Sequence, residues 1–140
     1  MAPPRVTVVR PYGERVRARV FALLSRASLE VVPDDIVPSG TSDADAIARV
    51  LASPNRILLV PFHAHRDASE DTLDGISFVR LLVATAPNRG FRVIMPVSRF
   101  AAAAVSLART AGDMPSAVLL VDEDELADPG LVTKVLAHVG

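Results

Sequence analysis

The sequence predicts an α/β fold in three layers, α/β/α, with a five-stranded parallel sheet between two layers of helices. Short, nearly continuous runs of Val, Ile and Leu recur five times along the chain. Runs without polar alternation are typical of strands buried on both faces of a parallel sheet. A segment of helical length follows each run, and strands that alternate with helices favour a parallel sheet covered on both faces.

The five expected strands are short and rich in β-branched residues. They occupy residues 6–9, 29–32, 57–60, 93–97 and 117–121. The helical connections between them are expected to cross over with a right hand.

The first two expected helices follow the first two strands. Residues 14–27 carry an apolar stripe at helical spacing. A second face of this helix, which we expect to be solvated, carries Arg15, Arg19 and Arg26. The second helix is expected to run from Ser42 to about Leu51, because Ser42 with Asp45 three residues later is a weaker form of the capping box.

The remaining helices have clear boundaries. The third is expected at about residues 73–85, before a turn cluster at 87–90, and the alanine-rich fourth at 99–109. The fifth begins with Asp128 as N-cap and Pro129 at the first helical position. Its inward positions are expected to be Leu131, Val132, Val135, Leu136 and Val139.

The composition of the chain argues against several classes of function. A length of 140 residues fits one domain, with 15 basic and 16 acidic residues, no cysteine, and Lys134 as the only lysine. The near-zero net charge argues against nucleic-acid binding, and the absence of cysteine excludes thiolate chemistry and disulfides. No segment resembles a signal peptide or is long enough to span a bilayer, so we expect a cytoplasmic protein without membrane contact.

Five strand–helix units in a chain of this length fit the flavodoxin-like strand order 2-1-3-4-5. In such folds ligands bind outside the carboxyl ends of the strands. Residues that directly follow the strands are therefore the candidates for function.

Three segments of the chain have a recognisable pattern. DGISFVRLL at residues 74–82 resembles the start of the third helix in response-regulator receiver domains. VIMPVS at 93–98 resembles its fourth strand, and VTVVRPYGERVRARVFALL at 6–24 resembles its first strand and helix. The plan covers about residues 5–139, and the resemblance implies one receiver-like domain over residues 1–140.

The receiver's phosphorylation residues are substituted in this chain. Receivers place an acidic pair after the first strand, a phospho-accepting Asp at the end of the third, Thr or Ser after the fourth, and Lys after the fifth. In this chain Arg10 and Pro11 replace the acidic pair, and Val60, Pro61 and Phe62 stand where the phospho-accepting Asp would be. Val97 or Ser98 corresponds to the Thr or Ser after the fourth strand. Val121 or Asp122 corresponds to the Lys after the fifth. The resemblance therefore implies a pseudo-receiver that lacks aspartyl phosphorylation.

Charges at two of these positions are reversed relative to a receiver. Arg10 follows the first strand and Asp122 follows the fifth, with Ser98 after the fourth. Arg10 and Asp122 could form a salt bridge across the carboxyl-edge crevice, the space outside the carboxyl ends of the strands. Alternatively, both side chains could be solvated.

The segment after the third strand is the most unusual part of the chain. His63, His65 and Asp67 have a spacing that could supply metal ligands, and further acids follow to Asp71. The alternative is a polar loop whose histidines form local hydrogen bonds. No catalytic residue and no cofactor is expected, and these three side chains are the candidate ligands if a metal binds.

The function expected from these observations is a non-catalytic module that binds a protein partner or forms a homodimer. Receivers commonly use the fourth helix, fifth strand and fifth helix for this purpose. The corresponding candidate surface contains Arg99, Ala102, Ala103, Arg109, Leu126 and Lys134. The alternative is a small enzyme or a metal- or ligand-binding domain that uses residues 63–71.

Overall fold

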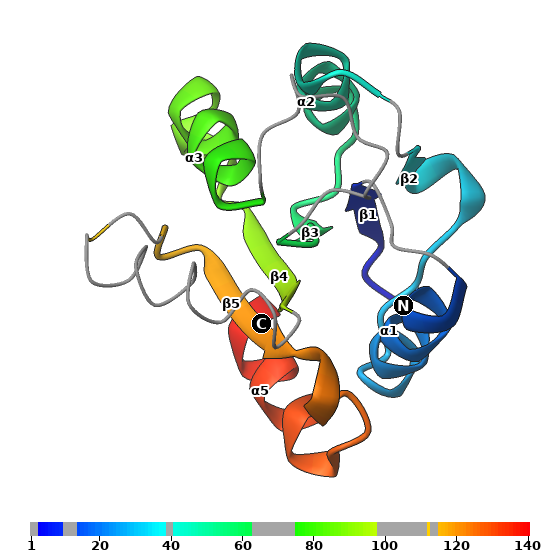
Figure 1. Ribbon diagram of the computed structural model, residues 1–140. Coiled ribbons are helices and arrows are strands. Elements are labelled where there is room, and N and C mark those ends of the chain that lie inside the picture. The colour runs from blue at the N-terminus through cyan, green and yellow to red at the C-terminus, as the bar shows by residue number, and fades with distance from the viewer. Residues whose placement is uncertain (1–2, 10–13, 39–40, 63–74, 98–111, 113–114) are drawn as a thin grey trace.

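The computed structural model describes residues 3–9, 14–38, 41–62, 75–97, 112 and 115–140 (Figure 1). The elements in chain order are β1 (Val6–Val9), α1 (Glu14–Arg26), η1 (Pro33–Asp35), β2 (Ile36–Val37), α2 (Asp43–Ala52), β3 (Ile57–Leu59), α3 (Gly75–Thr85), η2 (Pro87–Arg89), β4 (Arg92–Val97), β5 (Val118–Asp122), η4 (Glu123–Glu125) and α5 (Pro129–Val139), where η marks a 3-10 turn.

The five strands form one parallel sheet in the order β2-β1-β3-β4-β5. The fold class and the strand order predicted from the sequence are confirmed. Helices α1 and α5 cover one face of the sheet, and α2 and α3 cover the other (Figure 1). This arrangement brings the arginine-rich first helix beside the last helix of the chain.

A separate hydrophobic core lies on each face of the sheet. On the α2/α3 face the core includes Phe78, which is 1% exposed and lies in one cluster with Leu58, Leu82 and Met95. On the α1/α5 face, Leu23 and Leu24 pack with residues that include Ile94, Leu126 and Val135. Each fully buried aliphatic or aromatic side chain stabilises the fold by about 1.5–3 kcal/mol relative to exposure.

The second strand was predicted at the wrong place. Residues 29–32 contribute only an isolated bridge between Glu30 and Arg5, and β2 begins later, at Ile36. The reason is Pro33, which has no N–H to donate and starts the η1 turn. The chain therefore leaves the sheet after Glu30 and returns beside Val8, where Ile36 pairs.

The predicted helix caps are confirmed for α2 and α5. The side chain of Ser42 accepts a hydrogen bond from the Asp45 N–H, and the carboxylate of Asp128 accepts one from Gly130 N–H at 2.9 Å. The turn expected at residues 87–90 forms η2 and ends in Gly90 with a φ of 66°. The expected start of the third helix at 73 and the whole expected fourth helix, 99–109, lie outside the described residues.

Helix α5 buries a narrower stripe than the sequence predicts. Leu131 and Val135 are buried as expected, but Leu136 is 48% exposed, so its expected inward position is wrong. Successive helical residues are about 100° apart, so one stripe of contact with the sheet cannot include every apolar position of this helix. Val132 and Val139 are half-buried and pack against the same core, as expected. His138 is also half-buried, and its Nε2 lies 2.8 Å from the carbonyl of Ala117.

Among the residues that the structure describes, no helix combines the length and the apolar character needed to cross a membrane.

Candidate functional site

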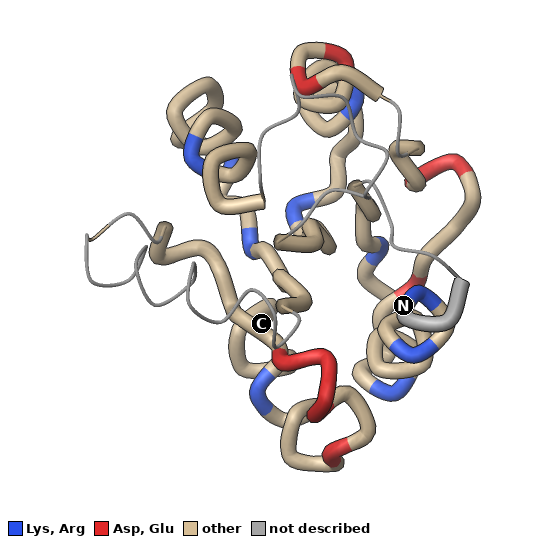
Figure 2. The backbone as a smooth tube through the Cα atoms, in the orientation of Figure 1, with Lys and Arg blue, Asp and Glu red and all other residues tan. Residues whose placement is uncertain are grey.

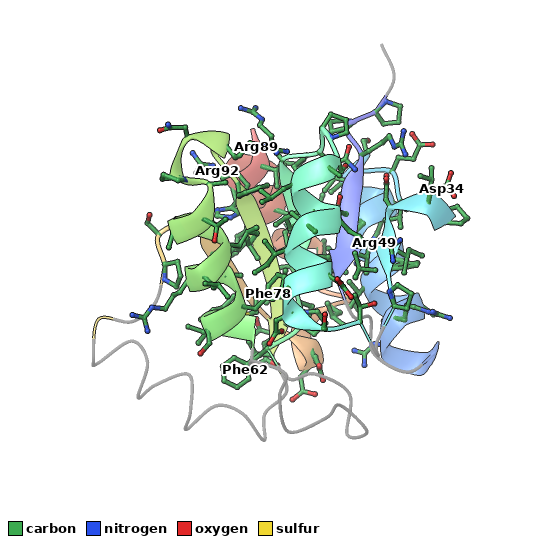
Figure 3. The ribbon with its side chains drawn as sticks, turned by 90° about the horizontal axis from the view of Figure 1, so that it is seen from above. Asp34, Arg49, Phe62, Phe78, Arg89 and Arg92 are labelled. Atoms are coloured by element: carbon green, nitrogen blue, oxygen red, sulfur yellow. The ribbon has the colours of Figure 1, made fainter. Side chains whose placement is uncertain are left out.

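The candidate site is the edge of the sheet at which the carboxyl ends of the strands meet. Parallel α/β folds bind ligands at this edge. Figure 3 shows Phe62 at this edge, with Arg89 and Arg92 at the opposite end of the sheet. We call the two ends the carboxyl edge and the amino edge.

Buried apolar residues fill the centre of the carboxyl edge. Val60 is 3% exposed and Phe62 is 4% exposed, and Pro61 between them is also buried. The pairing of the two central strands continues here, because Val60 N–H donates to Ile94 O at 3.0 Å and Phe62 N–H donates to Pro96 O at 3.1 Å. The end of β3 thus presents neither a carboxylate nor another charged side chain.

Helix α3 begins in close contact with this apolar end. The N–H of Gly75 donates to Phe62 O at 2.7 Å. A Cβ atom at position 75 would overlap the carbonyl oxygen of Pro61 and would lie 2.9 Å from Phe62 Cα, closer than real Cβ contacts. Glycine is required here because the helix start approaches the backbone of the strand end.

At the end of β5, Asp122 organises its own turn. Its Oδ1 accepts a hydrogen bond from Asp124 N–H at 2.9 Å, which caps the start of η4. Asp122 is exposed. The expected salt bridge between Asp122 and Arg10 stays a prediction, because Arg10 lies outside the described residues.

Two arginines of α1 hold the turn after β5. Arg19 Nη2 donates to Glu123 O at 2.8 Å, and Arg26 Nη2 donates to Leu126 O at 2.6 Å. Figure 2 shows the basic residues of α1 in blue and the acidic turn η4 in red. Arg19 and Arg26 are exposed, as expected of a solvated face, and their guanidinium groups also bind main-chain carbonyls. The side chain of Arg15 is not described.

Of the residues expected in the carboxyl-edge crevice, the structure describes Asp122. The others lie outside the described residues, namely Arg10, His63, His65, Asp67 and Ser98. Within the described ranges, no group of three or more His, Cys, Asp or Glu side chains could hold a metal ion. The apolar residues at the end of β3 add no side-chain oxygen, and a divalent cation prefers several oxygen ligands.

The expected interaction surface is described at two of its positions. Lys134 is exposed on α5, as a surface residue should be. Leu126 is 1% exposed and packs in the core of the α1/α5 face, so its expected place on the surface is wrong. Its carbonyl binds Arg26, which fixes the residue beneath α1. Outside the described residues lie Arg99, Ala102, Ala103 and Arg109.

Sequence reasoning missed a polar network at the amino edge. Arg89 donates to Leu51 O at 2.9 Å and to Ser53 O at 2.6 Å, where α2 ends, and its guanidinium lies 5.2 Å from the ring centre of Phe91. At the same edge Asp35 forms two hydrogen bonds with Arg5, and this carboxylate raises the pKa of the Arg5 guanidinium. The signal in the sequence was the excess of arginine over lysine, since a guanidinium can bind two acceptors at once.

Comparison with solved structures identifies the fold. The chain superimposes on a sensor protein from Polaromonas sp. JS666 with a TM-score of 0.59 and 18% identity over 98% of both chains. The receiver domain of the Francisella response regulator 1452 gives a TM-score of 0.57 and 13% identity, over 98% of this chain and 99% of that one. The receiver domain of AraT, a response regulator from Geobacillus stearothermophilus, gives a TM-score of 0.57 and 16% identity, over 99% of this chain and 96% of that one.

The sequence matches no protein-family model, and no curated protein is significantly similar to it. The expected resemblance to receiver domains is thus confirmed at the level of the fold, which is as far as identities below 20% reach.

Proposed function

We propose that this chain is a receiver-like regulatory module that works by binding a protein, either a partner or a second copy, and that it acts without aspartyl phosphorylation. In this proposal it is a single, non-catalytic domain of the cytoplasm that does not bind nucleic acid. The solved structures with the same fold include receiver domains of response regulators, which supports a role in signalling.

The buried, apolar end of β3 is the observation that carries the proposal. Phosphorylation of an aspartate needs a carboxylate there as nucleophile and neighbouring charges that stabilise the transferred group. Val60, Pro61 and Phe62 supply no nucleophile, and the Gly75 N–H binds the Phe62 carbonyl at the same place. Asp122, the last residue of β5, is one of the two residues that correspond to the receiver's lysine, and its negative charge would repel a phosphoryl group.

The exposed side of α5 supports the proposed role in binding. Leu136 is a large apolar residue that is 48% exposed, and Lys134 is exposed on the same helix. Residues two positions apart in a helix do not face each other, so Leu136 is the α5 side chain that we propose contacts an apolar surface of a partner, and Lys134 lies on another side of the helix. The proposed binding face consists of Leu136 and the expected fourth helix, which lies outside the described residues.

Incubation with acetyl phosphate and Mg²⁺ tests whether the chain accepts a phosphoryl group. We expect the intact mass to stay unchanged, because the end of β3 lacks a carboxylate. A receiver domain that carries the phospho-accepting aspartate serves as the positive control for the donor. Addition of a phosphoryl group that hydroxylamine removes would identify an acyl phosphate and would overturn the proposal.

A further inference from the structure

His138 is the histidine that lies within the described residues, and it belongs to the last turn of α5. Its side chain is half-buried, and its Nε2 atom lies 2.8 Å from Ala117 O and 3.1 Å from Val93 O. Val93 is the second residue of β4 and Ala117 directly precedes β5, so both carbonyls stand at the amino edge. The ring of His138 therefore reaches from the helix to the point where β4 and β5 begin to pair.

The two acceptors determine which nitrogen of the ring carries the proton. A carbonyl oxygen accepts hydrogen bonds and cannot donate them, and a neutral imidazole has one N–H and one lone-pair nitrogen. With two carbonyl oxygens at hydrogen-bond distance, Nε2 is the protonated nitrogen, and it shares its N–H between them. The Ala117 carbonyl has a second lone pair, with which it accepts the Val93 N–H at 2.9 Å.

Within the described residues, the last turn of α5 has one other half-buried side chain. Val139 packs against the α1/α5 core, whereas Leu136 and Ala137 are exposed. The N–H of Gly140 donates to Leu136 O, so this bond stays within the turn. Local opening of a folded protein occurs where few apolar contacts are buried, and the end of α5 is such a place.

We propose that His138 acts as a latch, in which its Nε2–H holds the last turn of α5 on the start of the β4–β5 pair. When this hydrogen bond is lost, residues 136–140 open while α1, α2 and the sheet stay folded. Leu136 lies in the same turn, so the latch fixes where this exposed side chain is presented. The inference rests on His138 Nε2 and the two carbonyl oxygens, and it does not require that Leu136 bind a partner.

Long-range ¹H–¹⁵N correlation NMR of the neutral imidazole tests the position of the proton in the wild-type chain. We expect Nε2 to have the chemical shift of a protonated ring nitrogen and Nδ1 that of a lone-pair nitrogen. The spectrum of H138Q, which lacks this ring, assigns the His138 signals among those of the three histidines. A neutral ring that is protonated at Nδ1 would overturn the inference, because Nε2 could not donate.

Amide hydrogen exchange tests the latch itself in two matched variants. H138L keeps an apolar side chain of similar size without a donor, and H138Q offers an N–H at a reach similar to that of Nε2. In H138L the amides of residues 138–140 should exchange about two- to tenfold faster than in the wild type, the effect of losing one hydrogen bond. H138Q should restore most of this protection, and the amides of α2 should exchange as in the wild type in both variants.

L136Q is the control, because it changes an exposed side chain of the same turn. Its amides at residues 138–140 should exchange as in the wild type. Unchanged exchange in H138L, or exchange in H138Q that is as fast as in H138L, would overturn the inference. Faster exchange throughout α2 of H138L, or loss of its folded spectrum, would also overturn it, and would assign His138 to the stability of the whole domain.

Discussion

At the amino edge of the sheet, Arg89 reaches from the turn before β4 to the last carbonyls of α2, whereas at the carboxyl edge Val60, Pro61 and Phe62 close the centre with apolar side chains. In this fold the carboxyl edge is where polar groups are expected to meet a ligand. The difference shows that Arg89 binds the main chain of α2, whereas no polar side chain stands at the described end of β3. At the described end of β3, buried apolar side chains fill the centre of the carboxyl edge.

The arginines of α1 and α2 follow the same rule. Arg19, Arg26 and Arg49 each donate to a main-chain carbonyl of a distant segment. A guanidinium offers five donors in a planar group, whereas an ammonium is a compact, strongly hydrated charge. Arginine is therefore better suited than lysine to tie a helix to a neighbouring turn, which accounts for part of the arginine excess.

The largest effect should come from the carboxyl edge. Phe62→Ala should lower the free energy of unfolding by about 3–5 kcal/mol, because it empties a buried aromatic position. Phe21 on α1 is only partly buried, so Phe21→Ala should cost clearly less. Urea unfolding followed by circular dichroism measures both. Equal losses would mean that Phe62 does not close the edge.

A smaller effect is expected at the amino edge. Arg89→Gln should lower the free energy of unfolding by about 2 kcal/mol, because the two part-buried carbonyls at the end of α2 lose a charged donor. Arg92→Gln at the same edge is the matched control and should change stability little, since its guanidinium has no described partner. Thermal melts of the three proteins provide the comparison. A similar loss in both variants would show that the carbonyl contacts are not the source of the effect.

The smallest effect is expected from metal. Stoichiometric Zn²⁺ should leave the melting temperature unchanged, in keeping with a module that works without a metal. A rise that disappears in the His63→Ala/His65→Ala variant would contradict this and would favour the alternative in which residues 63–71 bind a metal or ligand.

The sequence predicted the fold well because its signals are local. Runs of apolar residues located the central strands, and Ser42 and Asp128 located two helix starts. The error at β2 arose because the apolar run before Pro33 has the composition of a strand but can form only one bridge with β1. The sequence also indicated the apolar end of the third strand, because Val60, Pro61 and Phe62 are consecutive in the chain.

Long-range contacts could not be predicted in this way. The surface position expected for Leu126 was wrong because α1 covers that residue, and the exposure of Leu136 depends on how α5 sits on the sheet. The bonds from Arg89 to α2 join residues 36 and 38 positions apart. Spacing along the chain contains no information about such pairs until the topology is known.

The hydrogen bond between Gly75 and Phe62 has an evolutionary consequence. It joins the two ends of the segment 63–74, so the chain leaves β3 and returns to α3 at one point. Doubling the length of a flexible connection costs only about 0.6 kcal/mol of closure entropy. The sequence between residues 63 and 74 can therefore be lengthened, shortened or exchanged while β3 and α3 keep their spacing. Such changes could alter what the protein binds without changing the fold.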